Sequence, residues 1–323
     1  MTTSEPSTSD TQALRILHIS DSHLSGDGSL HYGLVDTRAA LQRVLDRAGE
    51  LDAIDAVVAS GDLSDDGSEA SYRALRAAIE PWAAQRGAAV VYAMGNHDLR
   101  DGFETVLGER EGAKTVRGFR IVHLDSSVPG FGYGEMDASQ LDRLRAQLAE
   151  PTENGTIVVL HHPPVPANTP LLAALELQHP ETLLEACAGA NGSAEGSSVR
   201  LILSGHYHHS LVVTAAGIPV VVAPGITNTT DALAPAGTER ATIGAGFALI
   251  DLPASGGPVS GVPVSGRPVS GRPVTGGPVT GGPASAAPRV TFVSAPGPDD
   301  GTELFNLDAT AIEQIARAAG PQK

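Results

Sequence analysis

Short apolar runs separated by polar loops recur along the first 252 residues of the chain. Runs rich in branched apolar residues, and too short for helices, are typical of buried strands. They predict strands over residues 14–20, 56–60, 89–94, 118–126, 156–160, 199–204, 219–223 and 246–252. Two of these runs end directly before an aspartate or a histidine, and three more end one glycine before an aspartate, an asparagine or a histidine.

Segments with apolar residues at helical spacing lie between these runs. Residues 36–50 form the clearest case, and Asp36 or Thr37 can cap the start of that helix. The same spacing predicts three further helices: 68–85 (interrupted or kinked by Pro81), 137–149, and 171–188 (broken near His179 and Pro180). The alternation of strand, polar loop and helix predicts an α/β protein whose polar loops lie at one edge of a sheet.

The composition changes at Gly256, where six Pro/Gly pentads run in tandem to Ser285. Proline at every fifth residue disfavours both a helix and a strand ladder, so we expect an extended loop or linker. A strand over 289–294 and a helix over 308–319 follow, which places the repeat between two late strands whose ends lie close together. The expected organisation is a disordered polar leader, a main domain, the repeat loop and a C-terminal strand with a short helix (1–13, 14–252, 253–288 and 289–323).

Charge and cysteine content narrow the class of protein. A net charge of -16 argues against binding long nucleic acids, which are held mainly through lysine and arginine contacts to phosphates. The single cysteine, Cys187, excludes an intrachain disulfide and fits a reducing compartment. The polar start lacks the features of a signal peptide, and no apolar run approaches the roughly 20 residues that span a bilayer. We therefore expect a cytoplasmic protein without a membrane span, and the sequence is compatible with a homodimer.

Seven candidate metal ligands share one position, at or just beyond the carboxyl end of a predicted strand: Asp21, His23, Asp62, Asn96, His161, His206 and His208. Imidazole together with carboxylate favours Mn, Fe or Zn, whereas an all-oxygen set favours Ca or Mg. Seven exceeds the three or four ligands of a single catalytic zinc, so two metal ions fit better. Each motif alone has a plainer interpretation, such as a cap or a turn, and only the set points to a metal centre.

The ordered series Asp-x-His, Gly-Asp, Gly-Asn-His-Asp, His and Gly-His-x-His resembles the calcineurin-like metallophosphoesterases. Four flanking stretches are similar to the class III cyclic nucleotide phosphodiesterases of bacteria: 17–24, 94–98, 124–130 and 160–164. The resemblance covers about residues 14–252 and is weak over the C-terminal segment. It implies a four-layer αββα sandwich of two mixed sheets flanked by helices, in which residues 14–252 form the catalytic domain.

The resemblance also implies roles for individual residues. Asp21, His23 and His208 would hold one metal ion, Asn96, His161 and His206 the other, and Asp62 would bridge them. The ions would be Fe, Mn or both, with Zn as an alternative, and a hydroxide shared by them would attack phosphorus. His97 would assist the leaving group, Asp98 would orient His97, and substrate contacts are expected from Asn96, His97 and His209.

The remaining histidines have weaker claims to the site. His162 and His209 adjoin ligands, but neighbours on an extended chain point in opposite directions, so neither is expected to bind metal. His18 is expected to be a hydrogen-bonded core residue, no motif surrounds His31, His123 or His179, and Cys187 is expected to be buried and inert.

These features favour a phosphodiesterase acting on cyclic nucleotides, 3′,5′-cAMP in particular, with 2′,3′-cyclic nucleotides as further candidates. A general phosphodiesterase or phosphatase for small esters stays open, since a metal centre recognises phosphate and little else. A protein phosphatase fits less well, because that branch carries an arginine soon after the bridging aspartate and residues 61–67 contain none. A non-catalytic scaffold that binds partners through the repeat is the alternative from another class. It predicts that some of the metal ligands have been lost, whereas all seven are present in this chain.

Overall fold

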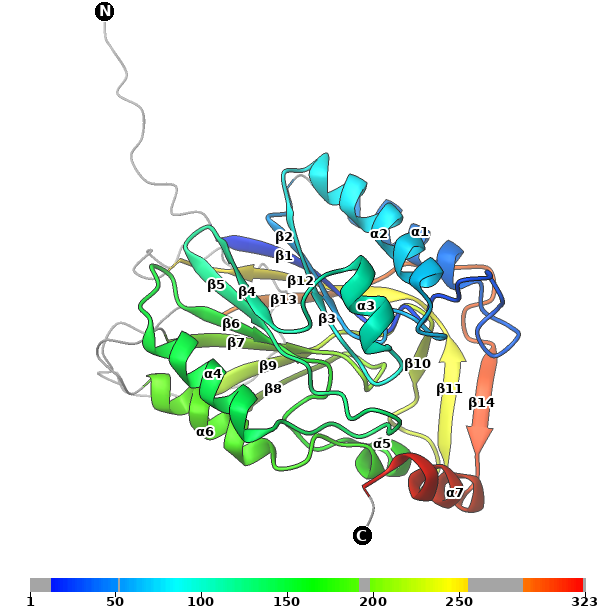
Figure 1. Cartoon of the computed structure of the whole chain (residues 1–323). Coiled ribbons are helices and arrows are strands. Elements are labelled where there is room, and N and C mark those ends of the chain that lie inside the picture. Colours follow the sequence, from blue (N-terminus) through cyan, green and yellow to red (C-terminus); the bar gives the residue numbers. More distant parts are fainter. Residues whose placement is uncertain (1–12, 52, 192–197, 255–286, 322–323) are drawn as a thin grey trace, which may run out of the picture.

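Two mixed β-sheets face each other, and helices cover the outer side of each (Figure 1). The computed structural model describes residues 13–51, 53–191, 198–254 and 287–321. Residues 1–12 of the predicted leader and the pentads lie outside the described residues. The expected four-layer αββα arrangement is confirmed.

The first sheet has the strand order β13-β12-β1-β2-β3. The strands β1, β2 and β3 run parallel; β12 pairs antiparallel with β1, and β13 pairs antiparallel with β12. The helices α1 and α2 lie along its outer face (Figure 1). The bounds of these elements are β1 Leu14–Ile19, β2 Ala56–Ser60, β3 Ala89–Ala93, β12 Gly246–Leu252, β13 Arg289–Ser294, α1 Thr37–Ala48 and α2 Glu69–Ala84.

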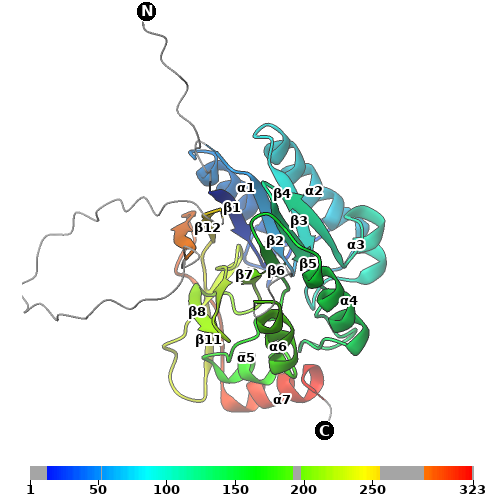
Figure 2. The ribbon, with the colours of Figure 1, turned by 90° about the vertical axis from the view of Figure 1, so that its left-hand side faces the viewer.

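The second sheet has the order β4-β5-β6-β7-β9-β8, in which β5, β6, β7 and β9 run parallel and the two outermost strands are antiparallel. The helices α4 and α6 pack on its outer face. Figure 2 shows them on the side of the molecule opposite α1 and α2. The bounds are β4 Gly112–Val116, β5 Phe119–His123, β6 Thr156–Val159, β7 Val199–Ser204, β8 Leu211–Ala215, β9 Ile218–Val222, α4 Ala138–Ala149 and α6 Pro180–Asn191.

Three apolar clusters fill the spaces between the four layers. One lies between the first sheet and its helices, a second between the second sheet and its helices, and the third between the two sheets. The middle cluster takes alternate residues of β1, such as Leu14 and Ile16, while Leu17 and Ile19 face the helices. Because both faces of β1 and β2 are buried, these strands are nearly continuous apolar runs, which made them easy to predict.

Local signals explain several element boundaries. Asp36, Ser68 and Asp308 each accept a backbone N–H at the start of a helix, as the sequence predicted for the first of these. The expected interruption at Pro81 is wrong, because α2 continues to Ala84 with the proline in its last turn. The predicted helix over 171–188 is two helices, α5 (Pro170–Ala174) and α6, and His179 between them has a left-handed backbone.

The sequence did not predict α3 (Arg100–Val106), β4, β8 or a small third sheet with the order β10-β11-β14. The third sheet stands beside the ends of the two main sheets (Figure 1). Its strands are β10 (Asn228–Thr230), β11 (Glu239–Ile243) and β14 (Glu303–Leu307), and α7 (Ala309–Ala319) follows β14. These strands are polar or half-exposed, so they lack the apolar runs that revealed the central strands.

The strands on either side of the pentads pair with each other. In the register of β12 and β13, Asp251 lies opposite Arg289, so the ends of the intervening loop are close together, as expected. Within the described part of the chain, no helix has the length and apolar character needed to cross a bilayer.

Candidate metal centre

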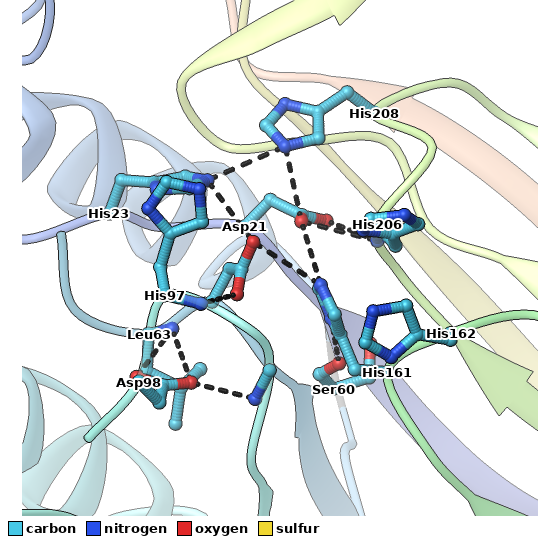
Figure 3. Close-up of polar contacts among 12 residues, drawn as sticks. Asp21, His23, Ser60, Leu63, His97, Asp98, His161, His162, His206 and His208 are labelled. Carbon is cyan, nitrogen blue, oxygen red and sulfur yellow. Dashed lines mark hydrogen bonds and ion pairs between the residues drawn. The ribbon is translucent and has the colours of Figure 1, made fainter. Parts of the chain in front are cut away.

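The parallel strands of both sheets bring all seven predicted ligands to one edge of the molecule. Asp21 and His23 follow β1, Asp62 follows β2 and Asn96 follows β3, while His161 follows β6 and the remaining two histidines follow β7. Carboxyl ends of parallel strands meet at a common sheet edge, and here the edges of two facing sheets meet as well. Figure 3 shows the imidazole rings and carboxylates pointing toward one another.

The ligand atoms form two groups that share one carboxylate. Asp21, His23, Asp62 and His208 make up the first group, and Asp62, His161 and His206 the second. In each group the candidate ligand atoms all lie within 4.8 Å of one another. The aspartates and histidines divide in the way that the resemblance implied, with Asp62 in both groups, and Asn96 lines the same cavity.

Individual distances define the first group. The Nε2 atom of His208 lies 3.2 Å from Oδ1 of Asp21 and 3.4 Å from Nε2 of His23. The same nitrogen of His23 lies 3.8 Å from Oδ2 of Asp62.

The second group is centred on His161. Its Nε2 atom lies 3.2 Å from Oδ2 of Asp62 and 3.9 Å from Oδ1 of Asp21. The backbone N–H of His206 donates to both oxygens of Asp21 at 3.2 Å, which ties the β7 loop to the β1 loop.

Oxygen atoms outside the groups fix three of the four candidate imidazoles. Nδ1 of His23 contacts Oδ1 of Asp65 at 3.2 Å. Nδ1 of His161 donates to the carbonyl of Ser60 at 2.8 Å, and Nε2 of His206 donates to the carbonyl of Leu175 at 3.0 Å. A hydrogen bond on one ring nitrogen leaves the other nitrogen directed into the cluster, as at histidines that bind metals.

The neutral ligand also fits a metal centre. The side-chain oxygen of Asn96 is buried and has no hydrogen-bond partner among the described residues. A buried oxygen without a partner costs free energy unless something pairs with it, and a cation supplies such a partner. The mixed oxygen and imidazole set suits Mn, Fe or Zn, so the residues present fit the metal centre that the sequence predicted.

The loops that carry the ligands have unusual backbone conformations. Nine non-glycine residues in the described part of the chain have positive φ, and five of them are predicted ligands: Asp21, His23, Asp62, His206 and His208. Such a conformation costs about 1–3 kcal/mol at a residue with a side chain and persists only where the surroundings impose it. Its concentration at this edge supports a functional role for these loops.

Two glycines allow the loops to approach one another. A Cβ atom on Gly61, where φ is +107°, would lie 2.4 Å from Nδ1 of His161. A Cβ atom on Gly95 would lie 2.3 Å from both the backbone nitrogen and Oδ1 of Asp62. Any side chain at either position would therefore push a candidate ligand out of place.

The charges in the cluster oppose the cost of burial. Burial alone would lower the pKa of His161, but Asp62 and Asp21 outweigh it and raise this pKa to about 9. Burial likewise favours the protonated form of Asp62, yet His161, His97 and His23 hold the pKa of that carboxyl well below its usual range. Asp62 therefore stays ionised, as a carboxylate shared between two cations must be.

His97 lies at the open side of the centre. Its backbone N–H donates to Oδ1 of Asp62 at 2.8 Å, and its side chain is 45% exposed. Nδ1 of His97 lies 3.6 Å from Oδ1 of Asp65, the same oxygen that contacts His23. The position of His97 suits a group that reaches a bound phosphate ester.

Asp98 does not contact the ring of His97, so the expected orienting contact is wrong. Its carboxylate instead accepts backbone N–H groups from Leu63, Ser64 and Gly95 at 2.9–3.2 Å. Burial and the charge of Asp62 raise the pKa of Asp98 to about 7. Asp98 therefore joins the loops after β2 and β3, and Asp65 is the carboxylate that faces His97.

The other histidines occupy distinct places. Both ring nitrogens of His162 are hydrogen-bonded, to Ser126 and to the Gly132 carbonyl, which fits the expectation that it is not a ligand. His209 is 7% exposed and stacks on Tyr207, outside the residues that line the cavity at the centre, so its expected substrate contact is not supported.

Two further expectations about buried groups are confirmed. His18 is fully buried, with Nε2 2.8 Å from the Ser60 hydroxyl. Cys187 is also fully buried, and burial raises the pKa of its thiol to about 12.

Sequence reasoning missed two residues that contact the centre. Asp65 contacts three histidines, and one of them is His31. Nδ1 of His31 lies 3.2 Å from Oδ2 of Asp65, and the ring of His31 stacks on that of His23 with centroids 4.7 Å apart. The position of Asp65, three residues after Asp62 in the same loop, could have indicated its role. His31 belongs to no motif, and only the fold brings it to the site.

Comparison with known proteins places this site in a family. Residues 14–210 match the model of the calcineurin-like phosphoesterase family. A cAMP/cGMP dual specificity phosphodiesterase of Mycobacterium tuberculosis is 40% identical over 238 residues, which cover 71% of this chain and 73% of the relative. A 3′,5′-cyclic adenosine monophosphate phosphodiesterase of Pseudomonas aeruginosa is 32% identical over 68% of this chain and 82% of its own length.

Among solved structures, a dimetal phosphatase from Danio rerio has the same fold. It has a TM-score of 0.50 and 16% sequence identity, and the match covers 74% of this chain and 95% of that one. Sequence, fold and ligand arrangement agree: the chain belongs to the calcineurin-like phosphoesterase family.

Proposed function

We propose that this chain is a dinuclear metal-dependent phosphodiesterase of cyclic nucleotides. Its proposed substrate is 3′,5′-cAMP, with cGMP and 2′,3′-cyclic nucleotides as further candidates. The observation that carries the proposal is the pair of ligand groups that share Asp62. The named activities of two relatives, at 40% and 32% identity, support the choice of substrate.

The residues of the first group would hold one metal ion, and Asn96, His161 and His206 the other, with Asp62 between them. Fe, Mn or both are the proposed ions, with Zn as the alternative, and this set of carboxylate, amide and imidazole ligands is compatible with each of them. Two ions bound there would polarise the phosphoryl oxygens and supply a nucleophilic water at neutral pH.

The protein's own groups position the substrate and handle the proton. His97 stands at the open side of the centre with its ring exposed, where it can donate a proton to the departing ribose oxygen or stabilise the charge that develops there. Asp65 holds His97 and His23 in a fixed relation, because one of its oxygens contacts both rings.

Kinetics with several substrates on one metal-loaded sample test the proposal. We expect hydrolysis of 3′,5′-cAMP, and of bis(p-nitrophenyl) phosphate with added Mn²⁺, with both activities lost in Asn96→Ala. Inactivity toward every cyclic nucleotide, with bis(p-nitrophenyl) phosphate still hydrolysed, would leave a general phosphodiesterase. Inactivity toward all of these esters with every metal would contradict the enzymatic proposal.

A further inference from the structure

A row of aromatic rings leads outward from the metal centre. His31 stacks on the candidate ligand His23, with ring centroids 4.7 Å apart. Tyr32 meets His31 edge-on at 4.6 Å, and Phe305 lies 5.7 Å from Tyr32. All four rings line the cavity that contains the centre.

The two outer rings, Tyr32 and Phe305, come from segments that are far apart in the sequence and contain none of the metal-ligand motifs. Tyr32 belongs to the loop between β1 and α1, and Phe305 to β14, which follows the pentads by sequence. In β14, Phe305 pairs with Ala241 of β11. The third sheet therefore carries a ring from beyond residue 252 to the mouth of the site.

Structural packing alone does not account for Tyr32. Its side chain is 62% exposed, and its backbone is left-handed with a φ of 51°. Exposure of a large aromatic side chain forgoes most of its burial free energy, and the left-handed backbone adds strain. The chain has only five tyrosines and six phenylalanines, so the meeting of two aromatic rings at this mouth favours a binding role.

From this arrangement we propose that Tyr32 and Phe305 form a stacking wall for the purine base of the substrate. The inference rests on the proposed function, because a cyclic nucleotide carries a flat base beside its phosphate. Aromatic side chains bind bases through their faces with little dependence on base identity. The wall would accept adenine and guanine alike, and the C-terminal segment would be part of the substrate site.

A second cavity offers the base an alternative position. It shares Asn96 with the first cavity and is lined by Leu99, Arg100, Val128 and Pro129 among others, with no aromatic ring among its described lining residues. The aromatic lining favours the Tyr32 side, and variants at Leu99 distinguish the two positions.

The test compares ligands with and without a base. In Phe305→Ala and Tyr32→Ala, we expect KM for 3′,5′-cAMP to rise about tenfold with kcat little changed. The inhibition constant of 5′-AMP should rise by the same factor, because 5′-AMP carries a base. The inhibition constant of ribose 5-phosphate, which has no base, should stay unchanged. Phe305→Leu keeps an apolar side chain without a ring and should resemble Phe305→Ala, whereas Phe305→Trp should resemble the unsubstituted enzyme.

Phe292→Ala is the matched control, because Phe292 is a 36% exposed phenylalanine on β13 and lines a different cavity. It should change none of these constants. An unchanged inhibition constant of 5′-AMP in both Phe305→Ala and Phe305→Leu would overturn the proposal. An equal rise in the inhibition constants of 5′-AMP and ribose 5-phosphate would also overturn it. A rise in KM in Leu99→Ala instead would place the base in the second cavity.

Failure of the proposed function gives a different result. If the enzyme hydrolyses only bis(p-nitrophenyl) phosphate, inhibition of that reaction by 5′-AMP and ribose 5-phosphate still tests the wall. Stronger inhibition by 5′-AMP than by ribose 5-phosphate, lost in Phe305→Leu, would then support the stacking wall even though the enzyme does not hydrolyse cyclic nucleotides. Absence of any such difference in the unsubstituted enzyme would overturn it.

Discussion

The floor of the site and its rim are built in opposite ways. The floor consists of the seven candidate ligands, all of which follow parallel strands. Five of them have a left-handed backbone, and five are buried. The rim consists of Tyr32, Leu171 and Phe305, half-exposed or exposed side chains from a loop, a short helix and a strand of the third sheet.

This difference separates the chemistry of the site from its choice of substrate. Floor residues must hold ligand atoms within a few ångströms, so their types and local spacing are tightly constrained. Rim residues need only present a surface of suitable shape, which many side chains can provide. We therefore expect floor substitutions to affect metal content and turnover, and rim substitutions to affect substrate binding.

Asp62→Ala should have the most severe consequence, because Asp62 belongs to both ligand groups. We expect loss of metal from both positions and a fall in kcat of about a thousandfold or more. Metal analysis and cAMP turnover on the same preparation measure this. Asp142→Ala, which removes an exposed carboxylate on α4, is the control and should change neither. Retention of two metal ions by Asp62→Ala would contradict the shared-ligand arrangement.

Two variants, Asn96→Ala and His97→Ala, distinguish metal binding by the floor from the catalytic role of the side chain that faces the substrate. Asn96→Ala removes the buried oxygen without a partner and should lower metal occupancy. His97→Ala should keep its metals and lose about 10²- to 10⁴-fold in kcat, the usual range for a general acid. Parallel metal analysis and kinetics distinguish the two. Equal metal loss in both variants would remove the distinction.

Asp65→Asn should have an intermediate effect. The substitution weakens the contacts that hold His23, His31 and His97, and loss of such an orienting carboxylate typically costs about 10- to 100-fold in metal affinity or activity. Competition with a chelator measures the affinity. Asp66→Asn in the same loop is the control, since Asp66 contacts the backbone of Gly26 and Ser68 and none of these histidines. Unchanged affinity and turnover would reduce Asp65 to a packing role.

Deletion of residues 256–285 should have the least effect. The strands on either side pair directly, with Asp251 opposite Arg289, and no candidate ligand lies in the deleted segment. Loop-closure entropy changes slowly with length, so we expect metal content and kcat within about twofold of the full chain. Melting temperature and kinetics check this. A collapse of activity in a folded deletion variant would show that the repeat acts at the site.

The sequence predicted the centre of the molecule better than its margins. The strands before Asp21, Asp62 and His161 are short apolar runs buried on both faces, and such runs are visible without a structure. The ligands stand at fixed offsets from those runs, so their convergence followed from the geometry of parallel strands. The third sheet has mixed polar strands, and β14 lies beyond the pentads, so its approach to the site could not be predicted from local pattern.

The contacts of individual side chains also could not be predicted from the sequence. Asp98 was expected to orient His97, as carboxylates near functional histidines commonly do, but the tight turn directs its carboxylate to the backbone of Leu63 and Ser64. Adjacency in sequence does not fix direction where the backbone turns sharply. Asp65 faces His97 although 32 residues separate them, and only the pairing of β2 with β3 brings them together.

Metal titration of the chelator-treated protein tests the central claim most directly. Bound metal and 3′,5′-cAMP turnover are measured on the same sample at each step of the titration. The account predicts saturation at two metal ions per chain, with turnover that follows occupancy of the second position. Full turnover at a single ion per chain, or two bound ions with no hydrolysis of any cyclic nucleotide, would contradict it.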